Sequence, residues 1–164
     1  MQTVDVRNAL KEKVMKYLGL ALFLLSSSAA LAGSAVDLPG YTLDISLSPR
    51  AAATLSQSGQ QIHVSAVYYG RAIKAEDGDE MGQVSLGTED VDLAAATRVT
   101  FGQVALDAAA LAKAADQQAY VNINVYTSRK KFPDNLLNCG LFEDRVEVAA
   151  QAPIAIACKL IDEN

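Results

Sequence analysis

The sequence predicts a mainly β protein: a single two-sheet sandwich of the transthyretin-like or immunoglobulin-like kind, with one or two short helices, behind a cleaved N-terminal signal peptide. Three observations predict it. Short segments of alternating apolar and polar residues recur between turn residues, which is typical of half-buried strands. Segments of helical composition are few and short. Two cysteines, Cys139 and Cys158, favour one disulfide over two free thiols in an exported chain.

Residues 1–32 have the composition of a secretory signal peptide. A basic leader precedes the apolar segment 18–25, which is shorter than the roughly 20 residues needed to span a bilayer. Ala30 and Ala32 form the small-x-small pattern after which signal peptidases cut. Translation from Met15 would leave an equally complete signal. We therefore expect residues 33–164 to form one β-sandwich domain in the periplasm or outside the cell, without a membrane span.

The expected mature chain is acidic. Cleavage after residue 32 removes four of the 14 basic and two of the 19 acidic residues, leaving 10 against 17 and a net charge of −7. A negative surface repels phosphate backbones, so nucleic acid is not an expected partner. The charge favours a basic partner or serves solubility alone.

The two cysteines are expected to be structural. They enclose 18 residues, and closing such a loop contributes roughly 3 kcal/mol in the chain-entropy model. A redox pair would need a spacing such as Cys-x-x-Cys, which is absent from the sequence.

The first half of the domain begins with an extended segment at 33–40 and an alternating strand at 41–47. Ser48 and Pro49 suit the cap and first position of a short helix over 50–55, and Gly59 ends that segment. Further elements are then expected in this order: a strand at 60–69 with Ile62, Val64, Ala66 and Tyr68 on its apolar face, an acidic loop at 76–80, a short strand at 83–86 ended by Gly87, and a turn at 88–92.

In the second half, residues 98–105 read as a strand, and Asp107 can cap an alanine-rich helix over 108–115. Period-two alternation then predicts a strand at 120–126, followed by a basic loop at 128–135. The remaining strands are expected at 136–139, 145–148 and 154–161, the last with Ile154, Ile156, Cys158 and Leu160 on one face.

The polar face of the strand 120–126 is the predicted ligand-binding surface. Its phenols offer flat apolar area, and its amides offer hydrogen-bond donors and acceptors, which suits contact with a sugar or a peptide. Ordinary cross-strand pairing on an outer sheet face would give the same pattern. Tyr69 would extend the surface if its strand is a neighbour, and the basic loop could hold a carboxylate or a sulfated sugar. The predicted site residues are Tyr120, Asn122, Asn124, Tyr126, Tyr69, Arg129, Lys130 and Lys131.

We expect no cofactor, metal or catalytic site. His63 is the one histidine, so a multi-histidine metal site within one chain is excluded, and the residue is predicted on the polar face of its strand. A loose calcium site using Asp77, Asp79, Glu80 and Asp90 stays open, although the loop lacks the carboxylates that an EF-hand requires at positions five and twelve.

These observations favour an exported, non-catalytic binding module that contacts a protein or a saccharide of the cell envelope. The alternative is an acidic inhibitor or immunity-type protein that neutralises a basic enzyme or toxin through residues 76–80 and 89–92. An enzyme would require His63 to lie in a pocket beside a serine or a carboxylate. The sequence leaves the oligomeric state open.

Overall fold

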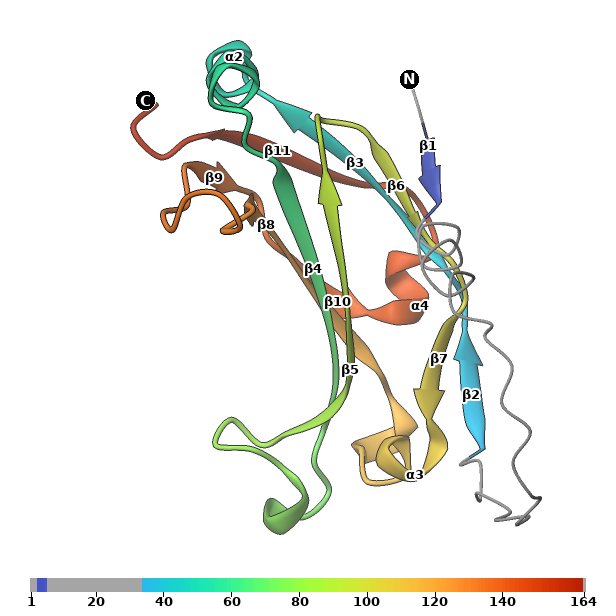
Figure 1. Cartoon of the computed structure of the whole chain (residues 1–164). Coiled ribbons are helices and arrows are strands. Elements are labelled where there is room, and N and C mark those ends of the chain that lie inside the picture. The colour runs from blue at the N-terminus through green and yellow to red at the C-terminus, as the bar shows by residue number, and fades with distance from the viewer. Residues whose placement is uncertain (1–2, 6–33, 164) are drawn as a thin grey trace, which may run out of the picture.

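The computed structural model describes residues 3–5 and 34–163 as a mainly β structure with short helices (Figure 1). Its largest sheet has the order β1 (Thr3–Asp5), β6 (Arg98–Phe101), β3 (Tyr41–Leu47), β11 (Ile154–Leu160), β9 (Leu137–Cys139). The second sheet has the order β10 (Phe142–Arg145), β8 (Tyr120–Thr127), β4 (Ile62–Arg71), β5 (Gln83–Leu93), and β2 (Ala35–Leu38) pairs with β7 (Val104–Asp107).

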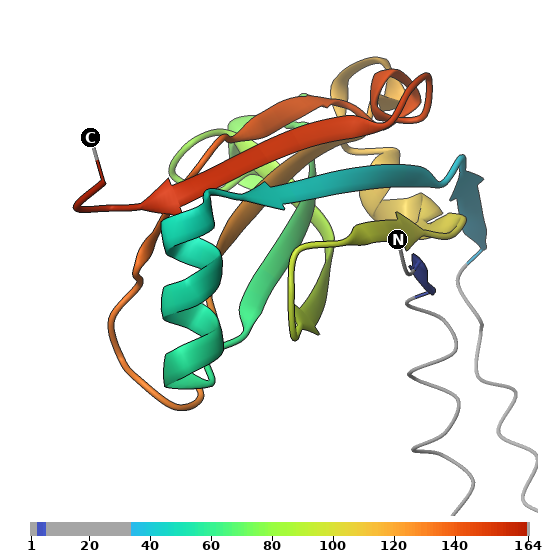
Figure 2. The same cartoon turned by 90° about the horizontal axis from the view of Figure 1, so that it is seen from above.

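The two larger sheets face each other across one apolar core. Alternate side chains of β3 and β11, among them Leu43 and Ile156, belong to the same buried cluster as Ile62 of β4 and Ile123 of β8. Figure 2 shows β3 and β11 running at an angle across β4 and β8. Every second residue of these strands is buried, as the period-two patterns predict. The opposite face of the four-stranded sheet therefore points outward.

The helix α2 (Pro49–Ser58) forms where its cap residues predict it, although it is longer than expected. The Ser48 hydroxyl accepts a hydrogen bond of 3.0 Å from the backbone N–H of Ala51, and Pro49 occupies the first turn, where its missing N–H costs nothing. Gly59 ends the helix in the left-handed conformation at φ 63°. The buried side chains of Ala51 and Leu55 dock the helix on the core.

Strand β5 corrects the prediction of a short strand ended by Gly87 and a turn at 88–92. One strand runs from Gln83 to Leu93 and pairs with β4 along its length. Gly87 has φ 139° and lies opposite Tyr68, where the register shifts by one residue. This is a β-bulge, and glycine supplies its unusual backbone without ending the strand. The carboxylates of Asp90 and Asp92 are tolerated there because both contact His63 on the outer face.

Two further elements differ from the predictions. The expected strand 98–105 is divided into β6 and β7, and the helix α3 (Ala108–Leu111) is shorter than 108–115 because the chain turns into a 3-10 segment at Ala115–Gln117. Asp116 and Gln117 there have positive φ angles, which a continuing helix excludes. Asp107 caps α3 as predicted, accepting a hydrogen bond of 2.9 Å from the N–H of Ala109.

The predicted strand 145–148 is also wrong. Strand β10 ends at Arg145, and the chain continues as the single-turn helix α4 (Val146–Ala149), which buries Val146 and Ala149 three residues apart. The backbone N–H of Val146 donates to the carbonyl of Ala119 at 3.0 Å, which holds the start of α4 beside β8. Apolar residues on one face of a single helical turn are hard to distinguish from alternation in so short a segment.

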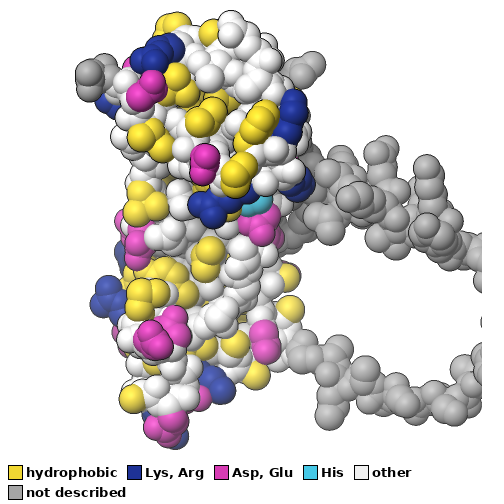
Figure 3. All heavy atoms as spheres, turned by 60° about the vertical axis from the view of Figure 1, so that its left-hand side comes forward, with side chains coloured by type: hydrophobic (Ala, Val, Ile, Leu, Met, Phe, Trp, Pro, Cys, Tyr) yellow, Lys and Arg dark blue, Asp and Glu magenta, His cyan; other side chains and the backbone are white. Residues whose placement is uncertain are grey.

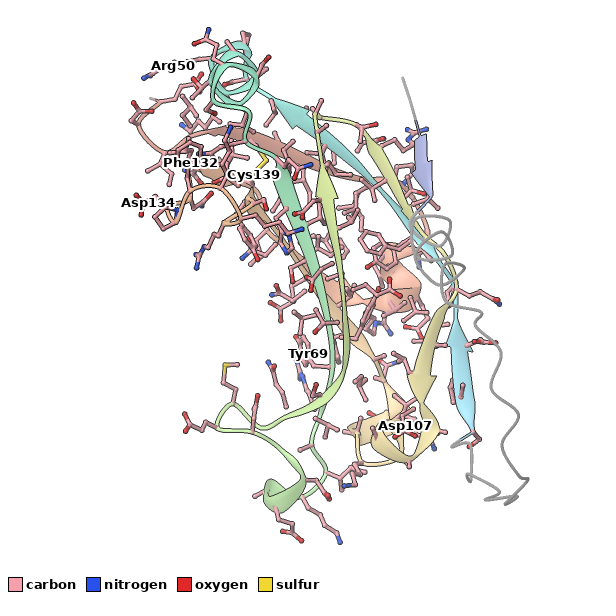
Figure 4. The ribbon with its side chains drawn as sticks, in the orientation of Figure 1. Arg50, Tyr69, Asp107, Phe132, Asp134 and Cys139 are labelled. Atoms are coloured by element: carbon pink, nitrogen blue, oxygen red, sulfur yellow. A yellow bond between two sulfur atoms is a disulfide. The ribbon has the colours of Figure 1, made fainter. Side chains whose placement is uncertain are left out.

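The predicted disulfide is present. Cys139 of β9 lies directly opposite Cys158 of β11, and the bond joins the edge strand to its neighbour (Figure 4). The predicted signal peptide lies outside the described residues except for β1, so its cleavage stays a prediction. Within the described ranges, the structure contains no helix with the length and apolar character needed to cross a membrane.

Candidate functional site

The predicted strand face is assembled on the outer side of the four-stranded sheet. The registers of β10, β8, β4 and β5 align its side chains in rows across the strands. Those rows are Asp92, His63 and Tyr126; Asp90, Ser65 and Asn124; Thr88, Val67, Asn122 and Glu143; and Ser85, Tyr69, Tyr120 and Arg145. Strand β4 is the neighbour of β8, which is the condition under which Tyr69 was expected to extend the predicted surface.

In one half of this face the side chains stack on or bond to one another. We call it the tied half, and it consists of Arg71, Tyr69, Tyr120, Asn122 and Glu143. The Tyr69 and Tyr120 rings stack with centroids 5.5 Å apart, and the Arg71 guanidinium lies 5.3 Å from the Tyr120 centroid. The Glu143 carboxylate accepts hydrogen bonds from the Tyr69 hydroxyl and, at 2.9 Å, from the Asn122 amide. Burial and the bond to Glu143 raise the pKa of Tyr69 to about 12. The Tyr120 ring is therefore covered by neighbours and offers a ligand little flat surface.

The other half, which we call the open half, consists of His63, Ser65, Asn124, Tyr126 and Arg129. The Asn124 side chain is exposed, and those of Ser65 and Tyr126 are partly exposed. A shallow pocket of about 330 Å³ opens at its end, between β4, β8 and the start of the basic loop. Its lining residues are His63, Tyr126, Ser128, Arg129 and Lys130.

His63 is the centre of a charge cluster in this pocket. Its Nδ1 lies 2.8 Å from Asp92 Oδ1, and its Nε2 lies 3.4 Å from Asp90 Oδ1. The imidazole also contacts the Tyr126 ring, with centroids 4.8 Å apart. Its side chain is 19% exposed, so it is less solvent-facing than its place on a polar strand face suggests. In Figure 3 the histidine is visible between basic and acidic side chains.

Asp92 holds this cluster together. Burial by itself raises the pKa of its carboxyl, but hydrogen bonds from Lys130 and His63 outweigh burial and hold the pKa below its ordinary value. The Lys130 ammonium donates to Asp92 Oδ2, while His63 contacts Oδ1. A carboxylate with two donors stays ionised and fixes the imidazole orientation.

The basic loop 128–135 lies back against the protein body. Lys131 donates a hydrogen bond of 2.8 Å to the carbonyl of Ser58 at the end of α2, so its ammonium lies away from the strand face. The Arg129 guanidinium lies 5.7 Å from the Tyr126 centroid. In Figure 4, Phe132 and Asp134 mark the part of the loop near α2. Of the three predicted basic residues, Arg129 and Lys130 line the pocket and Lys131 does not.

Polar side chains close the base of the loop. Asn135 Oδ1 accepts hydrogen bonds from the backbone N–H groups of Thr127 and Leu137, at 2.9 and 3.0 Å. The Thr127 hydroxyl, fully buried, accepts from the N–H of Leu136 at 3.0 Å. The loop therefore starts and ends at a fixed point beside the pocket.

Several partners of the face were not predicted: Glu143, Asp92, and the contact of His63 with two carboxylates. The segment 83–93 carries the available signal, because Asp90 and Asp92 are two residues apart and hence share a strand face. The turn predicted at 88–92 does not include that pairing. Glu143 carries no comparable signal, since its strand is only four residues long.

The candidate calcium ligands of the acidic loop make separate contacts. Asp79 Oδ1 accepts hydrogen bonds from the N–H groups of Met81 and Gln83, and Asp77 forms an ion pair of 3.1 Å with Lys113. Asp90 lies on β5 beside His63. Among the residues that the structure describes, no three acidic, histidine or cysteine side chains are placed to hold a metal ion.

The chain matches no protein-family model, and no curated protein or solved structure is significantly similar to it.

Proposed function

We propose that the protein is an exported, non-catalytic binding module that contacts a saccharide or a protein of the cell envelope through the open half. The two facing sheets would be a sandwich of the transthyretin-like or immunoglobulin-like kind. The disulfide between Cys139 and Cys158 supports folding in an oxidising compartment, the periplasm or the exterior. The proposal rests on the contrast between the tied half and the open half.

The observation that carries the proposal is the set of hydrogen-bonding groups that the open half leaves to solvent. Within residues 34–163, the Asn124 amide, the Ser65 hydroxyl and the Tyr126 hydroxyl have no hydrogen-bond partner in the structure, whereas Asn122 and Tyr69 in the tied half bond Glu143. Asn124 and Ser65 lie directly opposite each other on β8 and β4. A ligand can replace water on these groups without breaking internal bonds, because none holds another side chain.

The tied half has a supporting role in this proposal. Stacking and the shared Glu143 carboxylate hold β8, β4 and β10 in one arrangement. A surface ordered before the ligand arrives loses less conformational freedom on binding. The rigid neighbour therefore favours tight contact at the open half.

Mutation of the open half tests the proposal. We expect Asn124→Ala combined with Tyr126→Phe to lower retention of native envelope material by about thirtyfold, since each of the two lost hydrogen bonds costs about 1 kcal/mol. The control is Thr42→Ala with Ser46→Ala, which removes two partly or fully exposed hydroxyls from the outer face of the five-stranded sheet. Equal retention by wild type and both variants, at low and at high salt, would refute the proposal.

The acidic-inhibitor alternative has less support. Glu89 accepts a hydrogen bond of 3.3 Å from Tyr68 between the sheets, and Asp92 is held by Lys130 and His63. Asp79 accepts hydrogen bonds from backbone N–H groups. Several carboxylates of the acidic segments therefore make internal contacts. Salt-sensitive capture of a cationic protein by both variants above would favour this alternative.

The enzyme alternative has a specific geometric test. His63 does lie in a pocket with Ser128 and beside two carboxylates, but its Nε2 faces Asp90 at 3.4 Å. A base that activates a serine must instead face the serine hydroxyl. The geometry therefore favours a charge cluster over a nucleophile and its base.

A further inference from the structure

We propose that the pocket beneath the basic loop binds the anionic group of an acidic saccharide, a carboxylate or a sulfate, and that protonation of His63 strengthens this binding. The inference rests on the proposed function and names its ligand class. The pocket residues are His63, Tyr126, Ser128, Arg129 and Lys130.

Arg129 supplies the fixed charge for the anion. Lys130 in the same pocket is paired with Asp92, whereas Arg129 makes no ion pair with any described residue and is exposed against the Tyr126 ring. A guanidinium presents a planar fork of N–H donors that matches the oxygens of a carboxylate or a sulfate. Contact with an aromatic ring orients the guanidinium without using those donors.

The charge around His63 makes the anion affinity depend on pH. The groups that face it are Asp90 and Asp92 from β5, the Tyr126 phenol from β8, and Arg129 and Lys130 from the loop. With neutral imidazole, the two cations and two carboxylates cancel. Protonation gives the cluster one net positive charge, and both ring nitrogens then donate toward the carboxylates that would repel an anion. An anion is therefore held more strongly when His63 is protonated.

The surroundings of the pocket favour a saccharide over a protein. Asn124 and Ser65 continue from it along the sheet and can pair with sugar hydroxyls. Protein interfaces are centred on buried apolar and aromatic anchors. On the outer face of these strands, Val67 is the one exposed large apolar side chain among the described residues. The Tyr69 and Tyr120 rings stack on each other, and the partly exposed Tyr126 ring lies beside the Arg129 guanidinium.

The test measures the affinity of the full-length protein for polygalacturonate, dextran sulfate and neutral dextran at about pH 7.5 and about pH 5.5. We expect Arg129→Gln to weaken binding of an anionic polymer by about tenfold at both pH values, because it removes a charge-assisted bond. Lys131→Gln removes the same charge from the same loop, but its ammonium contacts Ser58 instead. This control should change affinity by no more than about twofold.

The comparison between the two pH values tests the role of His63. Wild type should bind the anionic polymer at least about threefold more tightly at the lower pH, and His63→Gln should show no such gain. Dextran sulfate and polygalacturonate distinguish the two anion sources, and neutral dextran measures contact with hydroxyls alone. Far-ultraviolet circular dichroism of each variant confirms its fold.

Three results would overturn the inference: equal loss for Arg129→Gln and Lys131→Gln, an unchanged affinity between the two pH values, or equal binding of neutral dextran. If envelope retention still depended on Asn124 and Tyr126 while these results held, the proposed function would stand and the anionic ligand would be refuted. If the retained material were protein, the saccharide class would be refuted in the same way.

Discussion

The hydroxyl oxygens of Tyr41 and Tyr68 lie 2.8 Å apart and join the two large sheets by a buried hydrogen bond. Tyr41 belongs to β3 and Tyr68 to β4, and both side chains are nearly inaccessible to solvent. Tyr68 also contacts Glu89 of β5 at 3.3 Å, and the Tyr41 ring stacks on Phe101 with centroids 4.9 Å apart. A polar connection thus crosses the largely apolar core between the sheets.

Removing that connection should destabilise the fold. Tyr68→Phe leaves the Tyr41 hydroxyl without this partner in a buried position, which typically costs about 1–3 kcal/mol. We expect the urea midpoint to fall accordingly with an unchanged slope. Tyr126→Phe is the control, because its hydroxyl is on the outer face and makes no described hydrogen bond. An equal effect of both substitutions would contradict the importance of the bond between the sheets.

Stability should also fall at high pH. Burial is the main factor that raises the pKa of Tyr41, Tyr68 and Tyr69, the last to about 12. The unfolded chain releases these protons near pH 10, whereas the folded chain keeps them. The stabilisation is therefore complete below pH 10. The part that Tyr69 contributes is lost as the pH rises from there through about 12, and Tyr41 and Tyr68 lose their parts at higher pH.

Absorbance of tyrosinate during an alkaline titration measures this directly. We expect these three phenols to ionise together with loss of the far-ultraviolet β signal. Ionisation of every tyrosine near pH 10 in a chain that stays folded would show that the buried positions are accessible.

The disulfide should contribute to stability in proportion to its loop. Replacing both cysteines, with Cys139→Ala and Cys158→Ala, should lower the free energy of unfolding by roughly 3 kcal/mol in the chain-entropy model. Thermal unfolding of the double variant, compared with the oxidised and the reduced wild type, measures the effect. An unchanged melting temperature, or free thiols in the native protein, would contradict the role assigned to the bond.

Alanine substitutions at two glycines measure the cost of backbone strain where steric crowding is absent. A Cβ added at Gly87 or at Gly140 would meet no atom within 4 Å, but only Gly87 has a positive φ, 139°. We expect Gly87→Ala to cost about 1–3 kcal/mol, since this backbone conformation is open to glycine almost alone. Gly140→Ala should be close to neutral. Denaturant titration of both variants provides the measurement, and similar stabilities would argue against the bulge in β5.

The strands that the sequence predicts well are those whose alternation is uninterrupted. Residues 41–47 and 120–126 alternate without exception, and both become strands with the expected buried faces. The start of α2 follows from Ser48 and Pro49, whose roles depend on local contacts alone. In these segments, local preference and tertiary packing favour the same conformation.

The predictions failed where contacts between residues far apart in the sequence determine the local structure. Gly87 reads as a strand end, yet pairing with β4 on both sides carries β5 through it. Glu143 accepts hydrogen bonds from Asn122 and Tyr69, and Asp92 contacts His63. These partners lie on strands that are far away in the sequence. The composition of the face was therefore predictable, whereas its division into a tied half and an open half was not.

The most direct test of ligand binding at the open half is a map of chemical-shift changes in isotope-labelled protein titrated with the envelope material that it retains. We predict the largest changes at Ser65, Asn124 and Arg129, with little change on the outer face of β3 and β11. Changes confined to that opposite face or to the acidic loop 76–80, or no change at all, would contradict binding through the outer face of β4 and β8.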